Sequence, residues 1–111
     1  MTTLFVGAER PGLDVFWLDS TKTPVDFSTG TWTFAVSIEQ ADVETVVSGA
    51  TVATFASPTK DTGSSADIPS LQVTFAAGAI DSLVVGTAIV RINATSAGRN
   101  RRWKQTVRVE S

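Results

Sequence analysis

The stretch Thr31-Trp-Thr-Phe-Ala-Val-Ser-Ile-Glu39 decides the fold class. Its large apolar side chains recur at every second position, and the positions between them are small or polar. Successive side chains of a β-strand point to opposite faces, so this alternation predicts a strand with one buried and one wetter face. Aromatic and β-branched residues, which are enriched in strands, dominate the stretch.

Alternation or β-branched composition predicts further strands at residues 4–6, 13–18, 44–55, 71–75, 87–95 and 102–109. The 13–18 segment is apolar on both sides of the pleat, which is typical of a central or covered strand. The 44–55 segment is expected to break or bulge at Ser48-Gly49. A single helical turn near Ala79 to Leu83 is the only helix expected.

Turn signals rich in Gly, Pro, Asn and Asp separate the predicted strands. Their number and spacing predict an all-β domain of residues 1–111, an immunoglobulin-like antiparallel β-sandwich of about seven strands, with a small barrel as the alternative. All three tryptophans, Trp17 included, are expected in the core rather than on a ligand platform. We expect one core to contain Trp32, Phe34, Val36, Phe75, Val90, Ile92, Trp103 and Val107.

The composition argues against an enzyme. The 111 residues include no His, Cys or Tyr, which removes a Ser-His-Asp triad, a cysteine nucleophile and zinc sites of the usual kind. Asp14, Asp19 and Asp26 are the remaining carboxylate candidates, but Asp14 and Asp19 have opposite strand parity and should not face each other. We therefore expect no catalytic, cofactor-binding or metal-binding residues and no cofactor.

The polar segment 58–69 is the longest predicted connection. Its Gly, Ser and Asp content predicts a mobile solvated loop, with a binding loop as the alternative. Asp61 to Asp67 offer oxygen ligands, but they lack the spacing of a known calcium loop. Turn formation is the favoured role for these residues.

Charge is distributed unevenly along the chain. Residues 91–111 hold six cations and one acid, whereas residues 1–90 hold three cations and ten acids. Strand parity places Arg102, Lys104 and Arg108 on one face, with Arg99 and Arg101 in the preceding turn. These five residues are the candidate protein interface, although a solvated strand face is the simpler interpretation.

Nucleic acid is not an expected partner, because the net charge is −2 and Trp103 has the parity of the buried face. The first residues lack the basic start and apolar run of a signal peptide, and no apolar run is long enough to span a bilayer. We therefore expect a complete small gene product or a cleanly cut domain, made in the cytoplasm without membrane insertion.

Several segments together resemble the small immunoglobulin-like domains of tailed-bacteriophage tail and baseplate proteins, above all the attachment domains of upper-baseplate and tail-fibre proteins. The resemblance is carried by Asp26-Phe27 before Gly30, Thr31 to Val36, Leu83, Gly86 to Thr95, Arg102-Trp103 and Val107 to Val109. An aromatic residue is common in that family where this chain has Ala88.

The resemblance implies a non-enzymatic structural or adaptor subunit of a phage virion, in the tail, the baseplate or on the capsid. Its partners would be other virion proteins and copies of itself. One such partner surface would be an acidic neighbour meeting the basic strand, either a scaffold protein or the Glu39, Asp42 and Glu44 region of another copy. The alternative is a module that binds a host-surface glycan or receptor, which should expose an aromatic side chain, either Trp17 or a residue of a tip loop.

Overall fold

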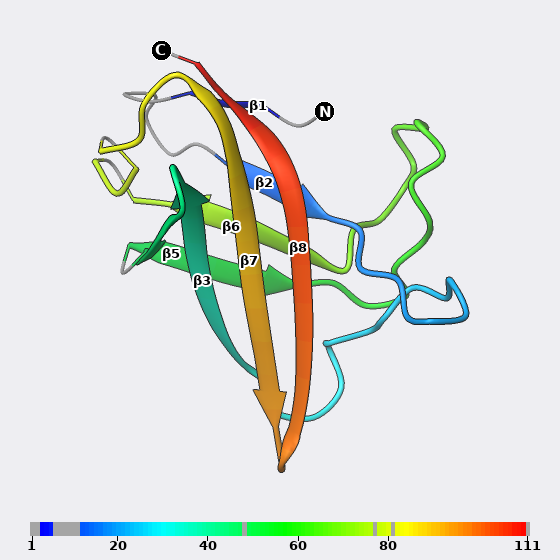
Figure 1. Cartoon of the computed structure of the whole chain (residues 1–111). Coiled ribbons are helices and arrows are strands. Elements are labelled where there is room, and N and C mark those ends of the chain that lie inside the picture. The colour runs from blue at the N-terminus through cyan, green and yellow to red at the C-terminus, as the bar shows by residue number, and fades with distance from the viewer. Residues whose placement is uncertain (1–2, 6–11, 48, 77, 81, 111) are drawn as a thin grey trace.

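The computed structural model describes residues 3–5, 12–47, 49–76, 78–80 and 82–110. Two β-sheets face each other across one hydrophobic core, which confirms the predicted all-β sandwich (Figure 1). The larger sheet consists, in spatial order, of β1 (Thr3–Phe5), β8 (Arg99–Glu110), β7 (Gly86–Ser96), β3 (Thr33–Gln40) and β4 (Val43–Val46). The smaller sheet consists of β2 (Gly12–Val15), β6 (Leu71–Phe75) and β5 (Ala50–Thr54).

The strand pairing departs from a wholly antiparallel sandwich at β1. This strand runs parallel to β8, with Leu4 opposite Val109, whereas every other pair of described strands is antiparallel. Eight strands are described where about seven were expected. Of the predicted strand at residues 4–6, Val6 lies outside the described residues.

The expectation of a central or covered strand at residues 13–18 is wrong. Among the described strands, β2 is an edge strand, paired only with β6. One face is buried through Leu13 and Val15, while Asp14 on the other face is exposed. The chain leaves the ladder after Val15, so Trp17 reaches the core from outside a strand and Leu18 stays exposed.

The predicted 44–55 strand is two strands in different sheets, because β4 and β5 belong to the larger and the smaller sheet respectively. The break falls near the predicted site, although Ser48 itself lies outside the described residues. Gly49 sits in a close approach, since a Cβ built there would lie 2.8 Å from Cβ of Ala79. Crossing between sheets, rather than a bulge, therefore explains the interruption.

The predicted helical turn near Ala79 to Leu83 is not a helix. Two i→i+3 hydrogen bonds occur instead, from the Ala79 amide to Ala76 O (3.0 Å) and from the Leu83 amide to Ile80 O (3.1 Å). Asp81 lies outside the described residues. Within the part of the chain that the structure describes, no helix has the length and hydrophobicity needed to cross a membrane.

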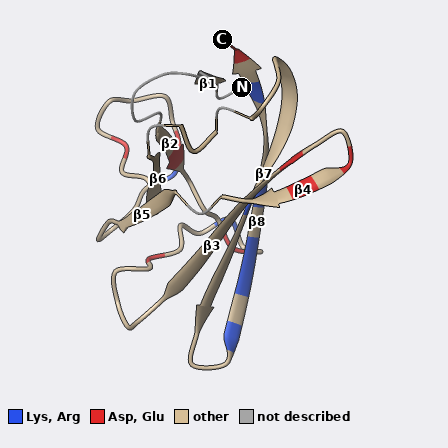
Figure 2. Cartoon of the chain, turned by 90° about the vertical axis from the view of Figure 1, so that its left-hand side faces the viewer, with Lys and Arg blue, Asp and Glu red and all other residues tan. Residues whose placement is uncertain are grey.

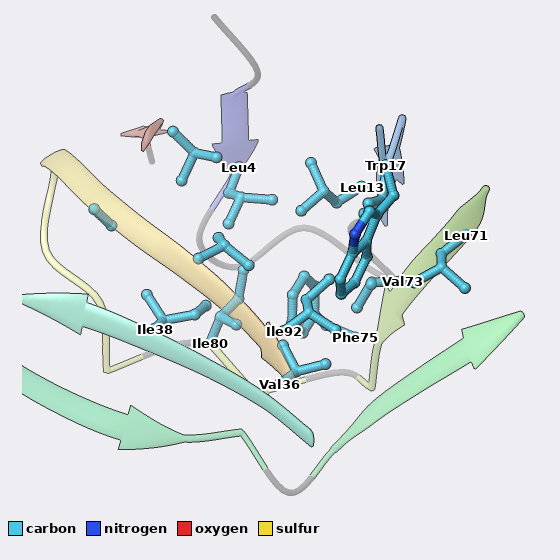
Figure 3. Packing of buried hydrophobic residues seen from close by; sticks show 14 of the residues in the cluster. Leu4, Leu13, Trp17, Val36, Ile38, Leu71, Val73, Phe75, Ile80 and Ile92 are labelled. Carbon is cyan, nitrogen blue, oxygen red and sulfur yellow. The ribbon is translucent and has the colours of Figure 1, made fainter. Parts of the chain in front are cut away.

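The predicted core is confirmed. Val36, Phe75, Val90, Ile92 and Val107 are buried in one cluster, and Trp32, Phe34 and Trp103 are partly buried against it. Figure 3 shows side chains from both sheets meeting in this layer. The cluster also contains residues outside the predicted set: Leu4, Leu13, Val15, Trp17, Phe27, Ile38, Leu71, Val73, Ile80, Ala88, Ala94 and Val109.

Two tight hairpins set the register of the larger sheet. Their two-residue turns, Ala41-Asp42 and Ala97-Gly98, have positive φ at both positions (51° and 63°, 47° and 81°). This is the turn geometry whose twist matches that of the flanking strands. The second turn is so short that β8 begins at Arg99, so the expectation that Arg99 and Arg101 belong to a turn is wrong.

Replacing Phe75 by alanine should destabilise the fold by about 3–5 kcal/mol, because Phe75 is fully buried between the sheets and truncation leaves a cavity. Val43→Ala is the control: Val43 is 63% exposed, and its truncation should change stability by less than about 0.5 kcal/mol. Urea unfolding of both variants measures the difference. Equal midpoints for Phe75→Ala and the wild type would contradict the assigned core.

Candidate functional site

The five predicted interface residues lie on β8, but its pleat divides them between two faces. Arg102, Lys104 and Arg108 are exposed, and Arg102 pairs with the exposed Asn93 of β7. Arg101 instead pairs with the fully buried Ala94. The first three therefore lie on the side of the larger sheet that faces away from the smaller sheet, which we call the outer face, and Arg99 and Arg101 lie on the inward-facing side.

The outer face adds a fourth cation that sequence analysis did not assign to the site. Arg91 of β7 is directly opposite Lys104. The sequence alone did not place Arg91 beside Lys104, because that neighbourhood depends on the register of the β7–β8 hairpin. The alternation within residues 87–95 does place Arg91 on the face opposite to Val90 and Ile92. Around these cations the surface forms an open depression of about 500 Å³, lined by Glu44, Arg91, Asn93, Arg102, Trp103 and Lys104.

Two carboxylates lie on the same outer face, at the β3–β4 hairpin (Figure 2). Glu39 and Glu44 are directly opposite each other, an arrangement that is destabilising for like charges. Separate donors relieve it: Arg91 Nη2 lies 3.0 Å from Glu39 Oε1, and the Ser37 hydroxyl donates to Glu44 Oε1 at 2.7 Å. The outer face therefore carries negative charge at β4 and positive charge at β8.

Among the described residues, one of the five β8 cations forms an ion pair. Arg108 Nε lies 3.0 Å from Glu110 Oε1, but the two side chains are 65% and 40% exposed, so this pair contributes little. Within the described residues, no ion pair involves Arg102 or Lys104. These two cations are therefore available to a partner.

The structure keeps the candidate carboxylates in separate hydrogen-bond networks. The Gln72 amide donates to Asp14 (3.1 Å), the Thr21 hydroxyl to Asp19 (2.7 Å), and the Ser28 amide to Asp26 (2.8 Å). At Asp19 and Asp26 the bonds favour the charged forms: the Thr21 hydroxyl lowers the pKa of Asp19, and the Ser28 hydroxyl lowers the pKa of Asp26. No group of three potential metal-ligating side chains occurs in the described ranges.

The 58–69 loop is organised by Asp67. Its carboxylate accepts hydrogen bonds from the amide of Thr62 (2.6 Å), the Thr62 hydroxyl (2.9 Å) and the amide of Ser64 (3.2 Å). The Thr62 amide is the main reason that the pKa of Asp67 lies below its ordinary value. The loop ends are tied by the Thr59 amide, which donates to Ile68 O at 2.8 Å.

The tryptophans form part of an aromatic cluster around Phe27. Its ring centroid lies 4.9 Å from that of Trp17, 5.1 Å from that of Trp32 and 5.5 Å from that of Phe34, in edge-to-face arrangements. Trp17 is only 4% exposed, which confirms the expectation that it lies in the core. It is therefore not the exposed aromatic side chain that the glycan-binding alternative requires. Trp32 and Trp103 are half-buried at the margin of the cluster.

Comparison with known proteins gives no match: no family model, curated protein or solved structure is significantly similar to this chain.

Acid should selectively remove the contribution of Asp67. Its folded-state pKa is lowered, so its charged form stabilises the loop fully above an unfolded pKa of about 3.9, and this stabilisation is lost as pH falls through the folded pKa. Asp67→Asn should therefore lower the melting temperature above about pH 4, and the difference from wild type should vanish at lower pH.

Thermal unfolding across this pH range measures the effect. Asp61→Asn, in the same loop, is the matched control, because Asp61 accepts from only one backbone amide, that of Gly63, in the described network. A wild-type to Asp67→Asn difference that is independent of pH would contradict the role given to the Asp67 carboxylate.

Proposed function

We propose that this chain is a non-enzymatic structural or adaptor subunit of a phage virion, and that it docks on other virion proteins through the outer face of its larger sheet. The carrying observation is the charge distribution of that face: Arg102 and Lys104 lack ion-pair partners in the described chain, and Glu39 and Glu44 lie two and three strands away, respectively. The separately engaged aspartates and the lack of His, Cys and Tyr support a non-enzymatic role.

The strand order supports an immunoglobulin-like assignment. If β2 to β8 are named B, C, C′, D, E, F and G, the sheets are G-F-C-C′ and B-E-D. Immunoglobulin variable-type sandwiches combine these strands in the same two sheets. The parallel strand β1 extends the first sheet at the edge next to β8. This order fits the resemblance to phage tail and baseplate domains that the sequence suggested.

The first neighbour we propose is a second copy of this chain. Three strand spacings, about 14 Å, separate β8 from β4. A two-fold axis that is parallel to the strands and centred between β7 and β3 places β8 of each copy over β4 of the other. A two-fold axis that is perpendicular to the strands but in the plane of the interface would instead place β8 over β8 and bring like charges together. Charge therefore selects the first arrangement.

The size of this contact indicates weak pairing between isolated subunits. β4 has four residues and β3 has eight, so they overlap β8 and β7 of the other copy over about 14 Å and about 27 Å. With strands about 4.8 Å apart, this gives roughly 400 Å² per copy, or about 800 Å² in total. Exposed ion pairs add only about 0–1 kcal/mol each. Such contacts become effective when many copies are held together, because each further contact forms at a high local concentration. A repeated virion subunit provides that situation.

Reversing the three outer-face charges should abolish self-association. In the variant Arg102→Glu, Lys104→Glu and Arg108→Glu, β8 would repel the Asp42 and Glu44 carboxylates of the β3–β4 hairpin. Sedimentation velocity at high protein concentration should show dimers for the wild type and monomers for the variant. Wild-type dimers should weaken between about 0.1 M and 1 M salt, because the screening length falls from about 10 Å to about 3 Å.

The matched control carries the same net charge change away from the outer face: Lys22→Glu, Lys60→Glu and Arg99→Glu, all at exposed positions. It should dimerise normally. Mixing the outer-face variant with Asp42→Lys, Glu44→Lys chains should restore dimers. If the outer-face variant dimerises like the wild type at low salt, this docking geometry is wrong.

The virion assignment has its own test. Quantitative mass spectrometry of purified particles from the source should find the chain in many copies per particle, since the proposed face works through repetition. Detection only as a soluble monomer, with none in particles, would overturn the virion assignment while leaving the self-association result standing.

A further inference from the structure

The inward-facing positions of β8 change character along the strand. Val109 and Val107 are fully buried, Gln105 and Trp103 are half-buried, and Arg101 and Arg99 follow towards the hairpin turn. Inward-facing positions of a sandwich strand normally carry apolar side chains. Two arginines in this row therefore indicate a place where the inner face of the larger sheet is no longer covered by the smaller sheet.

The lengths of the strands explain this gap. β7 has 11 residues and β8 has 12, whereas the strands of the smaller sheet have four or five. The β7–β8 hairpin consequently extends past the smaller sheet, and the segment that leads into β3 runs beside it (Figure 1). Between this segment and the hairpin lies an open hollow of about 510 Å³, which we call the tip hollow, lined by Asp26, Gly30, Trp32, Ser96, Arg99 and Arg101 among others.

The walls of the tip hollow are held in place by the aromatic cluster and by hydrogen bonds. Trp32 packs edge-to-face on the buried Phe27, at 5.1 Å between centroids. The Asp26 carboxylate accepts from the Ser28 amide (2.8 Å) and the Ser57 amide (3.3 Å). Side chains that are positioned before a ligand arrives lose less conformational freedom on binding.

We propose that the tip hollow binds a carboxylated saccharide of one or two rings. The guanidinium groups of Arg99 and Arg101 suit a carboxylate, which arginine can bind through two parallel hydrogen bonds. The half-buried Trp32 offers an apolar aromatic surface to the C–H face of a sugar ring. The volume lies within the roughly 300–1,000 Å³ of small-molecule sites.

Asp26 decides between a saccharide and an acidic peptide. The Asp26 carboxylate accepts three hydrogen bonds, from the amide and hydroxyl of Ser28 and the amide of Ser57. A carboxylate has about four acceptor sites, so Asp26 can accept a further hydrogen bond from a sugar hydroxyl group. A peptide with several acidic side chains would bring further negative charge towards Asp26 and towards Asp19, which already feels the charge of Arg101. A ligand with one carboxylate per ring and several hydroxyls fits both charges of the site.

Binding of digalacturonic acid to the ¹⁵N-labelled chain tests this inference. The indole N–H signal of Trp32 should shift and saturate, with a Kd of about 1 mM or tighter. Arg101→Gln should weaken binding by about tenfold or more, because a charged hydrogen bond is lost. Arg102→Gln is the matched control: it removes the adjacent arginine, which lies on the opposite face, and should leave the Kd unchanged.

Neutral digalactose should bind at least about tenfold more weakly than digalacturonic acid. A tetraglutamate peptide should not displace bound digalacturonic acid. The saccharide assignment is overturned by an unshifted Trp32 signal, by equal affinity for the neutral sugar, by preferential binding of the peptide, or by equal losses in Arg101→Gln and Arg102→Gln. Arg101→Gln should still dimerise, so this result is independent of the proposed outer-face docking. Amide spectra of both variants verify the fold.

Discussion

Burial of the inward-facing side chains of β7 is the interaction on which the rest of this structure depends. Ala88, Val90, Ile92 and Ala94 are all at most 3% exposed, and β7 has β3 on one side and β8 on the other. Because side chains alternate along a strand, burying this row fixes which residues of both neighbours face outward. A register slip of one residue would place Arg102 and Lys104 in the core, at a prohibitive cost for unpaired charges.

The same constraint gives β8 two chemically different surfaces. Its even-numbered cations face outward, on the same face as Arg91 and the carboxylates of the β3–β4 hairpin. Arg99 and Arg101 face inward, at the place where the smaller sheet has ended. Adjacent residues of one short segment therefore lie on opposite faces of the sheet. This is why a set of arginines close in sequence does not form one patch.

The charge placement also explains how like charges are tolerated in the larger sheet. Glu39 faces Glu44 across one pair of strands, and Arg91 faces Lys104 across another. The Arg91–Glu39 ion pair, at 3.0 Å, connects the two groups. Glu44 and Lys104 are the outer residues of these two pairs, and neither forms an ion pair in the described chain. A second copy in the proposed orientation would bring these two charges together.

The sequence by itself determined the strands whose alternation is strong. Residues 33–39, 71–75 and 102–109 could be assigned, together with their buried faces, because the pleat forces one face of each strand into a core whatever its neighbours are. The outward position of Arg102, Lys104 and Arg108 followed from the same rule. Only the tertiary structure decided which strands are neighbours, because pairing depends on contacts distant in sequence. It made β2 an edge strand, separated β4 from β5, paired β1 in parallel with β8 and brought Trp32 beside Arg99 and Arg101.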